Sequence, residues 1–249
     1  MPAEKRYVMR VWLPDRPGAL GAVASRLGSL KGDVIGLEII ERHGGMAVDE
    51  LVVALPESVP LELVAREVGS EEDVHVEDIR ALGDAAYDPQ LDALEAAAIL
   101  LGADSFDDLA WALCEHVGRC VRSDWATVID GNSDVASVGP APVYSWLNAF
   151  VAGSPAAESL GEDHDLDTIW MPLPAAGASL VIGRDAPFRA RERQRLAALS
   201  RIADAWFRRL RQQAAVRSAS VHPSSHAEMT TAGATLGPWP KRSLLSAPF

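Results

Sequence analysis

The distribution of apolar residues between Tyr7 and Leu82 constrains the fold of this chain more than any other feature. Four segments alternate apolar and polar residues, as half-buried strands do, and two others repeat apolar residues at helical spacing. Their order predicts strand, helix, strand, strand, helix and strand. This βαββαβ order within about 80 residues is typical of the ferredoxin-like split unit, a four-stranded antiparallel sheet with both helices on one face.

The two central strands of this unit are expected to form a hairpin around the turn His43-Gly44-Gly45. The pattern places apolar residues of both strands on one face of the sheet: Ile35, Leu37, Ile39, Leu51, Val53 and Leu55. The opposite face is left without a covering helix. Because an uncovered sheet invites association, we expect the unit to dimerise or to pack on a second domain.

The tetrapeptide Asp15-Arg16-Pro17-Gly18 separates the first strand from an apolar helix. Pro17 suits the first turn of a helix, Asp15 suits a position at or just before the N-cap, and Gly18 allows a close approach. The free N–H groups of such a turn attract an anionic group. Two interpretations remain open, because Asp15 either helps to bind a ligand or only caps the helix.

This segment resembles the ACT domain, a small regulatory module that commonly binds amino acids, and the resemblance implies an ACT-like domain over residues 1–82. In that family the equivalent loop meets a small ligand at a dimer interface. Many amino-acid-binding members carry a polar residue early in the second strand, where Val34 stands here, and valine cannot hydrogen-bond a ligand. The resemblance implies these ligand-binding residues: Asp15, Arg16, Pro17, Gly18, Ala19, Leu20, Val34 and Ile35.

Residues 83–90 have the Gly, Asp and Pro content of a linker, and a second domain is predicted over residues 91–213. Its segments read as two helices, a hairpin, a helix, two strands and a long final helix. The first helix is expected to bury one stripe, and the second is expected to be continuous from Phe106 to Val121. The expected stripe of the first helix consists of Leu91, Leu94, Ala98 and Leu101.

The second domain resembles the GAF family in this order and in the spacing of Phe188, Glu192, Leu196 and Leu199 at the start of the final helix. The resemblance implies an antiparallel sheet, helices on one face, and a small-molecule cavity on the other. Signatures of cyclic-nucleotide or bilin binding are missing. Aromatic residues that either line such a cavity or pack as core are Trp125, Tyr144, Trp146, Phe150 and Trp170. The expected fold class is therefore α+β.

Charge is distributed unevenly along the chain. The net charge is −12, but residues 184–217 carry +7 and residues 1–183 carry −20. The acidic majority argues against nucleic acid, because phosphates would be repelled. We expect the arginines of the last helix to point outward and to pair with acidic residues of the same or a neighbouring subunit. These arginines are Arg193, Arg201, Arg208 and Arg211.

No motif for a nucleophile, a phosphate loop or a metal site is recognised, so we expect a non-enzyme without cofactor or metal. Cys114 and Cys120 are expected to be buried structural thiols, and the acidic segment 161–167 is expected to be a solvated loop. No apolar run is long enough for a membrane helix, so we expect a cytoplasmic protein. Residues 214–249 are rich in Ser, Ala, Pro and Gly and are expected to be a disordered tail.

These observations lead to one main hypothesis and three alternatives. The main hypothesis is a homodimeric sensor that binds an amino acid or another small effector and acts through an unidentified protein partner. The first alternative is a structural adaptor whose two domains only dimerise or dock. The others are an enzyme that uses the GAF-like cavity and a nucleic-acid-associated transcriptional regulator.

Overall fold

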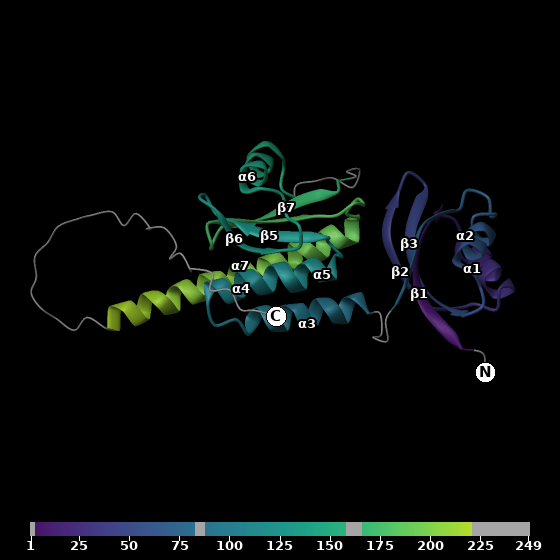
Figure 1. The fold of residues 1–249 in the computed structure, drawn as a ribbon, viewed down its shortest axis with the longest axis horizontal. Coiled ribbons are helices and arrows are strands. Elements are labelled where there is room, and N and C mark those ends of the chain that lie inside the picture. The colour runs from purple at the N-terminus through teal and green to yellow at the C-terminus, as the bar shows by residue number, and fades with distance from the viewer. Residues whose placement is uncertain (1–2, 83–87, 158–165, 221–249) are drawn as a thin grey trace, which may run out of the picture.

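The computed structural model describes residues 3–82, 88–157 and 166–220. It contains two antiparallel four-stranded sheets, each covered by helices, so the predicted α+β class is confirmed. The two sheets belong to two units that follow one another along the chain (Figure 1). We refer to residues 3–82 as the N-terminal unit and to residues 88–157 and 166–220 as the C-terminal unit.

The N-terminal unit has the predicted βαββαβ order, and its sheet order is β2-β3-β1-β4. Both helices pack on the same face of this sheet, and their buried residues Val23, Leu27, Val64 and Val68 meet an apolar layer from the central strands. The elements are β1 Glu4–Pro14, α1 Ala19–Ser29, β2 Asp33–His43, β3 Met46–Pro56, α2 Leu61–Val68 and β4 His75–Ala81.

Strand β2 departs from the expected burial pattern. Leu37 pairs with Leu51, but Ile35 lies at a register shift between Val34 and Gly36. The side chains of Ile35 and Leu37 remain 49% and 47% exposed. The physical reason is that β2 is an edge strand, so its apolar residues have a neighbouring strand on one side only.

The C-terminal unit has the predicted order of long elements, with sheet order β6-β5-β8-β7. The second predicted helix runs from Phe106 to Cys120, and a π-helical turn, Leu113–Val117, lies between its α-helical segments α4 and α5. The elements are α3 Pro89–Leu101, α4 Phe106–Ala112, α5 Gly118–Cys120, β5 Trp125–Ile129, β6 Asp134–Val138, α6 Tyr144–Gly153, β7 Thr168–Leu173, β8 Ala178–Gly183 and α7 Ala190–Ser220.

Two predicted boundaries shift. Helix α3 begins at Pro89, because the side chain of Asp88 accepts hydrogen bonds from the N–H groups of Gln90 and Leu91, both at 3.0 Å. Helix α7 continues to Ser220, so residues 214–220 of the predicted tail are helical. The linker residues 83–87, most of the acidic segment (161–165) and the tail residues 221–249 lie outside the described residues.

Helices α4 and α7 pack on one face of the second sheet, α3 packs against α7 on the same side, and α6 lies across the other face (Figure 1). The predicted inward stripe of α3 is wrong: Ala96 and Leu100 are buried, whereas Leu94 is 69% exposed. Small alanine side chains allow α3 to approach the long helix α7 closely, so the larger leucines remain on the outer side. The prediction failed also for Leu91, Ala98 and Leu101, which are exposed.

Candidate functional site

The loop before α1 does not use Asp15 as a helix cap. The N-cap is Gly18, in a left-handed conformation with φ 93°, and no side chain caps the helix. Asp15 instead donates its backbone N–H to the carbonyl oxygen of Gly45 at 2.8 Å. Its Oδ1 lies 3.7 Å from Nε of Arg42, at the end of β2. The interpretation of Asp15 as a mere cap is therefore wrong.

The N-terminal end of α1 is open to solvent. Asp15, Arg16, Pro17 and Gly18 are exposed, and no atom lies within 4 Å of the position that a Cβ would occupy at Gly18. The first N–H groups of a helix have no intrahelical acceptor, so an uncapped helix offers them to an anionic group.

The side chains of the next two predicted ligand residues are less accessible to a ligand. Ala19 is 6% exposed within the core, and Leu20 is half-buried against it. The backbone N–H of Ala19 already donates to the carbonyl oxygen of Arg16 at 3.3 Å, so of these two residues Leu20 has the N–H better suited to a ligand.

Asp49, which the sequence analysis missed, lies on the same face of the N-terminal sheet as the core residues Leu51 and Val53. It is 3% exposed on β3, between Val11 of β1 and Ile39 of β2. Its Oδ1 is buried without a hydrogen-bond partner among the residues that the structure describes. Burial raises the pKa of Asp49 to about 6; Arg42 opposes this rise, and the charge of Asp15 adds to it.

The remaining two predicted ligand residues lie elsewhere. Val34 and Ile35 follow the C-terminal end of α1, and this helix of 11 residues is about 16 Å long. The side chain of Val34 packs against the core of the N-terminal unit. One chain therefore does not bring these two residues to the loop that contains Asp15.

Most of the aromatic residues predicted to line a second pocket pack together under α6. Ile129, Leu147 and Val181 form a buried centre, and the rings packed around it are those of Trp125, Tyr144, Phe150 and Trp170. The hydroxyl of Tyr144 donates to the Asp130 carbonyl, and the indole N–H of Trp170 donates to that of Ser154, both at 3.2 Å. These are contacts of a packed cluster.

Trp146 differs from the other four aromatic residues. It is 45% exposed, and its ring stacks on that of Phe150 with centroids 5.3 Å apart. Three cavities elsewhere in the described part of the chain have none of these five aromatic residues in their lining.

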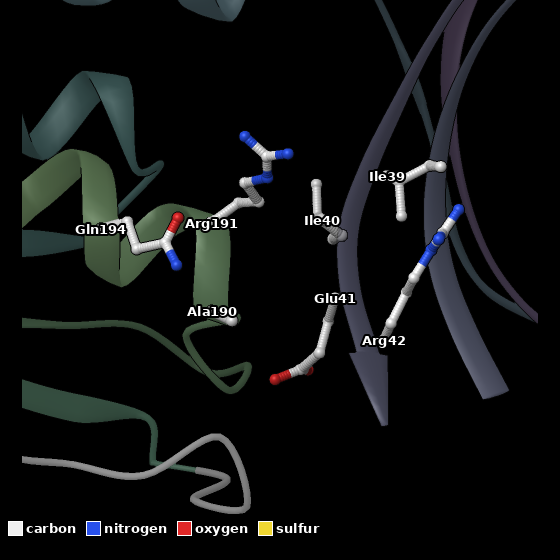
Figure 2. Close-up of a pocket in the computed structure, with 7 residues that line it drawn as sticks. All are labelled: Ile39, Ile40, Glu41, Arg42, Ala190, Arg191 and Gln194. Atoms are coloured by element: carbon white, nitrogen blue, oxygen red, sulfur yellow. The ribbon is translucent and has the colours of Figure 1, made fainter. Parts of the chain in front are cut away.

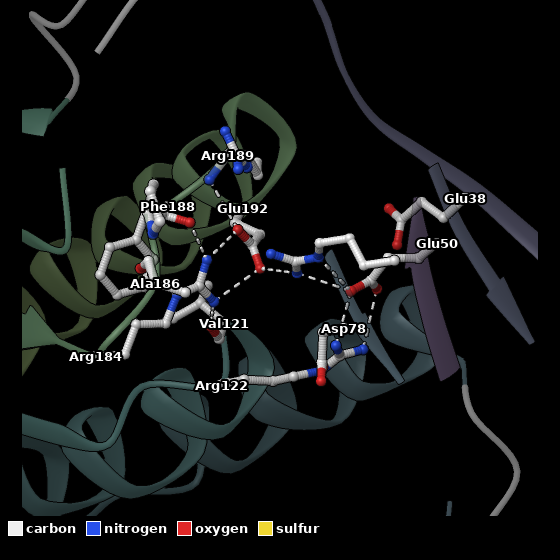
Figure 3. A network of polar contacts seen from close by, with 12 residues as sticks. Glu38, Glu50, Asp78, Val121, Arg122, Arg184, Ala186, Phe188, Arg189 and Glu192 are labelled. Atoms are coloured by element: carbon white, nitrogen blue, oxygen red, sulfur yellow. Dashed lines mark hydrogen bonds and ion pairs between the residues drawn. The ribbon is translucent and has the colours of Figure 1, made fainter. Parts of the chain in front are cut away.

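The second face of the N-terminal sheet, which no helix of its own unit covers, packs against the C-terminal unit through buried charges, and this is one of the two outcomes expected for it. Glu50 of β3 is 3% exposed and accepts hydrogen bonds from three arginines. The distances to Nη2 of Arg10, Nη1 of Arg122 and Nη2 of Arg80 are 2.7, 2.8 and 3.1 Å. Figure 3 shows the side chain of Arg122 reaching the carboxylate of Glu50. Arg122 belongs to the C-terminal unit, so this cluster joins the two units.

Glu192, on the first turn of α7, forms the second centre of this network. It accepts hydrogen bonds from Arg10 at 3.0 Å and from Nη2 of Arg184 at 2.6 Å. Burial alone would raise the pKa of Glu192, but the hydrogen bond and charge of Arg184, together with Arg10, hold it below its ordinary value. Arg10 therefore bridges two buried carboxylates from opposite units.

Arg189 makes the next connection, and its side chain is 4% exposed. It forms ion pairs with Glu41 of β2 at 3.3 Å and with Glu77 of β4 at 2.9 Å. Its guanidinium also lies over the ring of Trp12, 4.7 Å from the centroid. A further ion pair at 2.7 Å links Arg195 to Glu38.

Two cavities adjoin this network. One, of about 360 Å³, lies between β2 and the start of α7, where Glu41 points toward α7 and Arg42 points away from it (Figure 2). The other, of about 310 Å³, lies beside Arg10 and Asp124. The guanidinium groups of Arg10 and Arg122 at its wall already pair with carboxylates, so it offers little free positive charge.

The predicted roles of the arginines in the last helix are only partly correct. Arg193 is buried, at 6% exposed, and donates to the carbonyl oxygen of Phe188 at 2.6 Å, so its predicted outward orientation is wrong. Arg201, Arg208 and Arg211 are exposed. The pairs to the acidic N-terminal unit are made instead by Arg189 and Arg195, because the start of α7, and not its end, meets that unit.

Other candidate chemistry is limited in the part of the chain that the structure describes. No group of three or more His, Cys, Asp or Glu side chains is placed to hold a metal ion within residues 3–82, 88–157 and 166–220. Burial raises the pKa of Cys114 to about 12 and that of Cys120 to about 11, which disfavours thiolate chemistry. None of the described helices combines the length and the apolar character that crossing a bilayer requires.

Comparisons with known proteins do not assign this chain. No protein-family model matches it, and no curated protein matches it. Among solved structures, it is similar to a protein of unknown function from Galdieria sulphuraria, at 14% identity. That match covers 82% of this chain and 94% of the other, with a TM-score of 0.30, and at this score it carries no argument about fold or function.

Proposed function

We propose that this chain is a non-enzymatic regulatory protein that binds an amino acid at the N-terminal end of α1. The observation that carries the proposal is Asp49, a buried carboxylate whose Oδ1 has no partner among the described residues. A buried acid without a partner costs free energy, and a ligand ammonium group would remove that cost. The uncapped helix beside it suits the carboxylate of the same ligand.

The two ends of an amino acid fit two parts of this surface. Asp49 and Asp15 suit the ammonium group, and Arg42 with the first N–H groups of α1 suits the carboxylate. The resemblance to the ACT family supports the same location. On this proposal the N-terminal unit is an ACT-like domain.

A homodimer would complete the site. Strand β2 is an edge strand with an exposed Leu37, so two copies can pair antiparallel along it. Because β2 runs from the C-terminal end of α1 back to the loop at its N-terminal end, a two-fold axis near the middle of β2 brings the partner's Val34 and the partner's Ile35 toward the loop. The eight residues that the resemblance implies then share one site.

The C-terminal unit, on this proposal, is a GAF-like domain that passes the signal to a protein partner in the cytoplasm. Its aromatic cluster under α6 is the place where the family's cavity is expected. The alternative function, a structural adaptor, is favoured by one observation: the network of Arg10, Glu50 and Glu192 holds the two units together without any ligand. Neither function requires nucleic acid, a cofactor or a membrane.

A thermal-shift screen of the common amino acids against the full chain separates these two functions. A ligand present at a hundred times its Kd should stabilise the protein by about 2.7 kcal/mol. We expect at least one amino acid to do so, and we expect the shift to disappear in Asp49→Asn and in Asp15→Ala. The matched control is Asp107→Asn, which changes an exposed acid at the start of α4 and should leave the shift intact.

The outcomes of this screen are distinct. If no amino acid shifts the melting temperature, the sensor is contradicted and the adaptor remains. If an amino acid binds Asp49→Asn as strongly as the unmodified chain, the proposed place of binding is wrong.

A further inference from the structure

We infer a second small-molecule site on the C-terminal unit, between β7 and α7, that takes a small carboxylate with an apolar body. The site is a cavity of about 340 Å³, near the lower end of the usual size of small-molecule pockets. It does not depend on the function proposed for the N-terminal unit. The lining residues that carry the inference are Met171, Pro172, Ala197, Ser200, Arg201 and Arg208.

Ser200 is the first indication of a ligand. This residue of α7 is 3% exposed and lines the cavity, and its Oγ has no hydrogen-bond partner among the described residues. An unsatisfied buried hydroxyl costs about 1–3 kcal/mol. A serine within a helix normally avoids this cost by bonding a carbonyl of the preceding turn. The hydroxyl is therefore available to a molecule in the cavity.

Arg201 is the second indication, because it supplies charge that the surrounding residues do not balance. Asp204, on the same wall, already accepts from the N–H of Ala175 at 2.6 Å and from Arg208 at 3.1 Å. Arg201 is exposed and forms no ion pair with any residue in the described ranges. Its guanidinium can bind a carboxylate through two parallel hydrogen bonds.

The rest of the cavity wall is apolar, so it favours an apolar body for the part of the ligand beyond its carboxylate. Met171 is 1% exposed, and Pro172 and Ala197 complete this part of the lining. Strand β7 is at the edge of its sheet, but Pro172 lacks the N–H that a further strand would need there. A small molecule with an apolar body therefore fits this wall better than an extended peptide.

This site is separate from the aromatic cluster that the sequence analysis singled out. Helix α7 and helix α6 cover opposite faces of the second sheet (Figure 1). The cavity is lined by residues of α7, so it lies on that side. The site is also separate from the interdomain network, because Ser200 follows Glu192 by two turns of α7.

Benzoate is the probe for this inference, since it joins a carboxylate to an apolar ring of suitable size. Binding to the full chain is followed by NMR chemical-shift changes, with inorganic phosphate and benzyl alcohol as comparison probes. We expect benzoate to bind with millimolar affinity and to shift resonances around residues 171–174 and 197–208. Phosphate, which lacks the apolar ring, and benzyl alcohol, which lacks the charge, should bind more weakly.

Three variants test the residues. Arg201→Gln and Ser200→Ala should each weaken benzoate binding by about tenfold, the effect of losing one charge-assisted hydrogen bond. Arg119→Gln, an exposed arginine on α5, should leave binding unchanged. Because Arg201 is exposed and the Ser200 hydroxyl is unpaired, both test variants should keep the melting temperature, which shows that they are folded.

The inference is overturned if benzoate does not bind, or if it binds Ser200→Ala and Arg201→Gln as well as the unmodified chain. Equal binding of phosphate and benzoate would overturn the ligand class, because the apolar wall would then contribute nothing.

Discussion

Two adjacent acids of β3, Asp49 and Glu50, point to opposite faces of the same sheet and lie in opposite surroundings. Both are 3% exposed. Glu50 is surrounded by Arg10, Arg80 and Arg122, whereas Oδ1 of Asp49 has no partner among the described residues. The comparison shows that burial alone does not define the role of an acid; the groups available to balance its charge do.

The two faces therefore differ in what they can do. On one face Glu50 and Glu192 are balanced by arginines of the same chain, so the network holds the two units together, although Oε2 of Glu38 at its rim has no hydrogen-bond partner among the described residues. On the other face Oδ1 of Asp49 has no hydrogen-bond partner among the described residues, and the charge of Arg42 offsets only part of the effect of burial on its pKa; we interpret this as the place for a ligand. Well-satisfied polar networks favour one rigid arrangement, and a buried polar group without a partner requires an explanation, of which a functional role is one.

The largest expected effect comes from Arg10→Ala. This change leaves Glu50 and Glu192 buried with fewer partners, and breaking a buried ion pair typically costs about 3–5 kcal/mol. We expect that loss in the free energy of unfolding, measured by urea denaturation. Arg6→Ala on the same strand is the control, because Arg6 is exposed, and it should change stability by less than about 0.5 kcal/mol. Similar losses in both variants would contradict the network.

Asp49→Asn is expected to increase the free energy of unfolding, by less than Arg10→Ala decreases it. The pKa of Asp49 is raised to about 6 in the folded chain, against about 3.9 in the unfolded chain. The folded state therefore binds more protons, and its stability falls as pH rises from about 4 to about 6. Asparagine carries no charge, so the variant should be more stable by about 3 kcal/mol at pH 7 and by little at pH 4. A stability difference that does not depend on pH would count against this assignment.

The affinity for a ligand should depend on pH through the same titration of Asp49. An ammonium group pairs with ionised Asp49, so the affinity for an amino acid identified by the screen should fall as pH decreases below about 6. The expected fall approaches tenfold for each pH unit, and calorimetric titrations between pH 4.5 and 7.5 measure it. Affinity that is constant across this range would show that Asp49 does not take part.

The smallest effect concerns the rim of the network. Arg195 and Glu38 are partly buried, at 14% and 19% side-chain exposure, and lie 2.7 Å apart. A double-mutant cycle with Arg195→Ala and Glu38→Gln should give a coupling energy of about 1 kcal/mol, well below the effect at Arg10. A coupling as large as that expected at Arg10 would remove the distinction between the centre of the network and its rim.

Local patterns in the sequence were sufficient for the order of the elements. The periodicity that predicted the βαββαβ order depends on neighbouring residues, and so does the Asp130 turn, where Oδ1 accepts from the N–H groups of Asn132 and Ser133. The inward stripe of α3 failed for a related reason. Its sequence is apolar on several sides, so the choice of the Ala96 side depended on how closely α7 could approach.

Local sequence patterns could not predict the contacts that define the two candidate sites. Arg10 and Glu192 are separated by 182 residues, and no local signal pairs them. Asp49 offered one signal: it is an acid at a position that strand alternation assigns to the core face, in line with Leu51 and Val53. Arg10 and Glu50 offered a second signal. They are charged residues on a sheet face that no helix covers, and such residues indicate that another domain packs there.

The central claim is that Asp49 is an unbalanced buried acid which a ligand ammonium group neutralises. A carbon-13 NMR titration of its carboxyl group, without and with the amino acid found by the screen, tests this most directly. The account predicts a pKa near 6 in the free protein and a clear decrease in the complex. A pKa close to the ordinary value of about 3.9 in the free protein, or one that the ligand leaves unchanged, would contradict it.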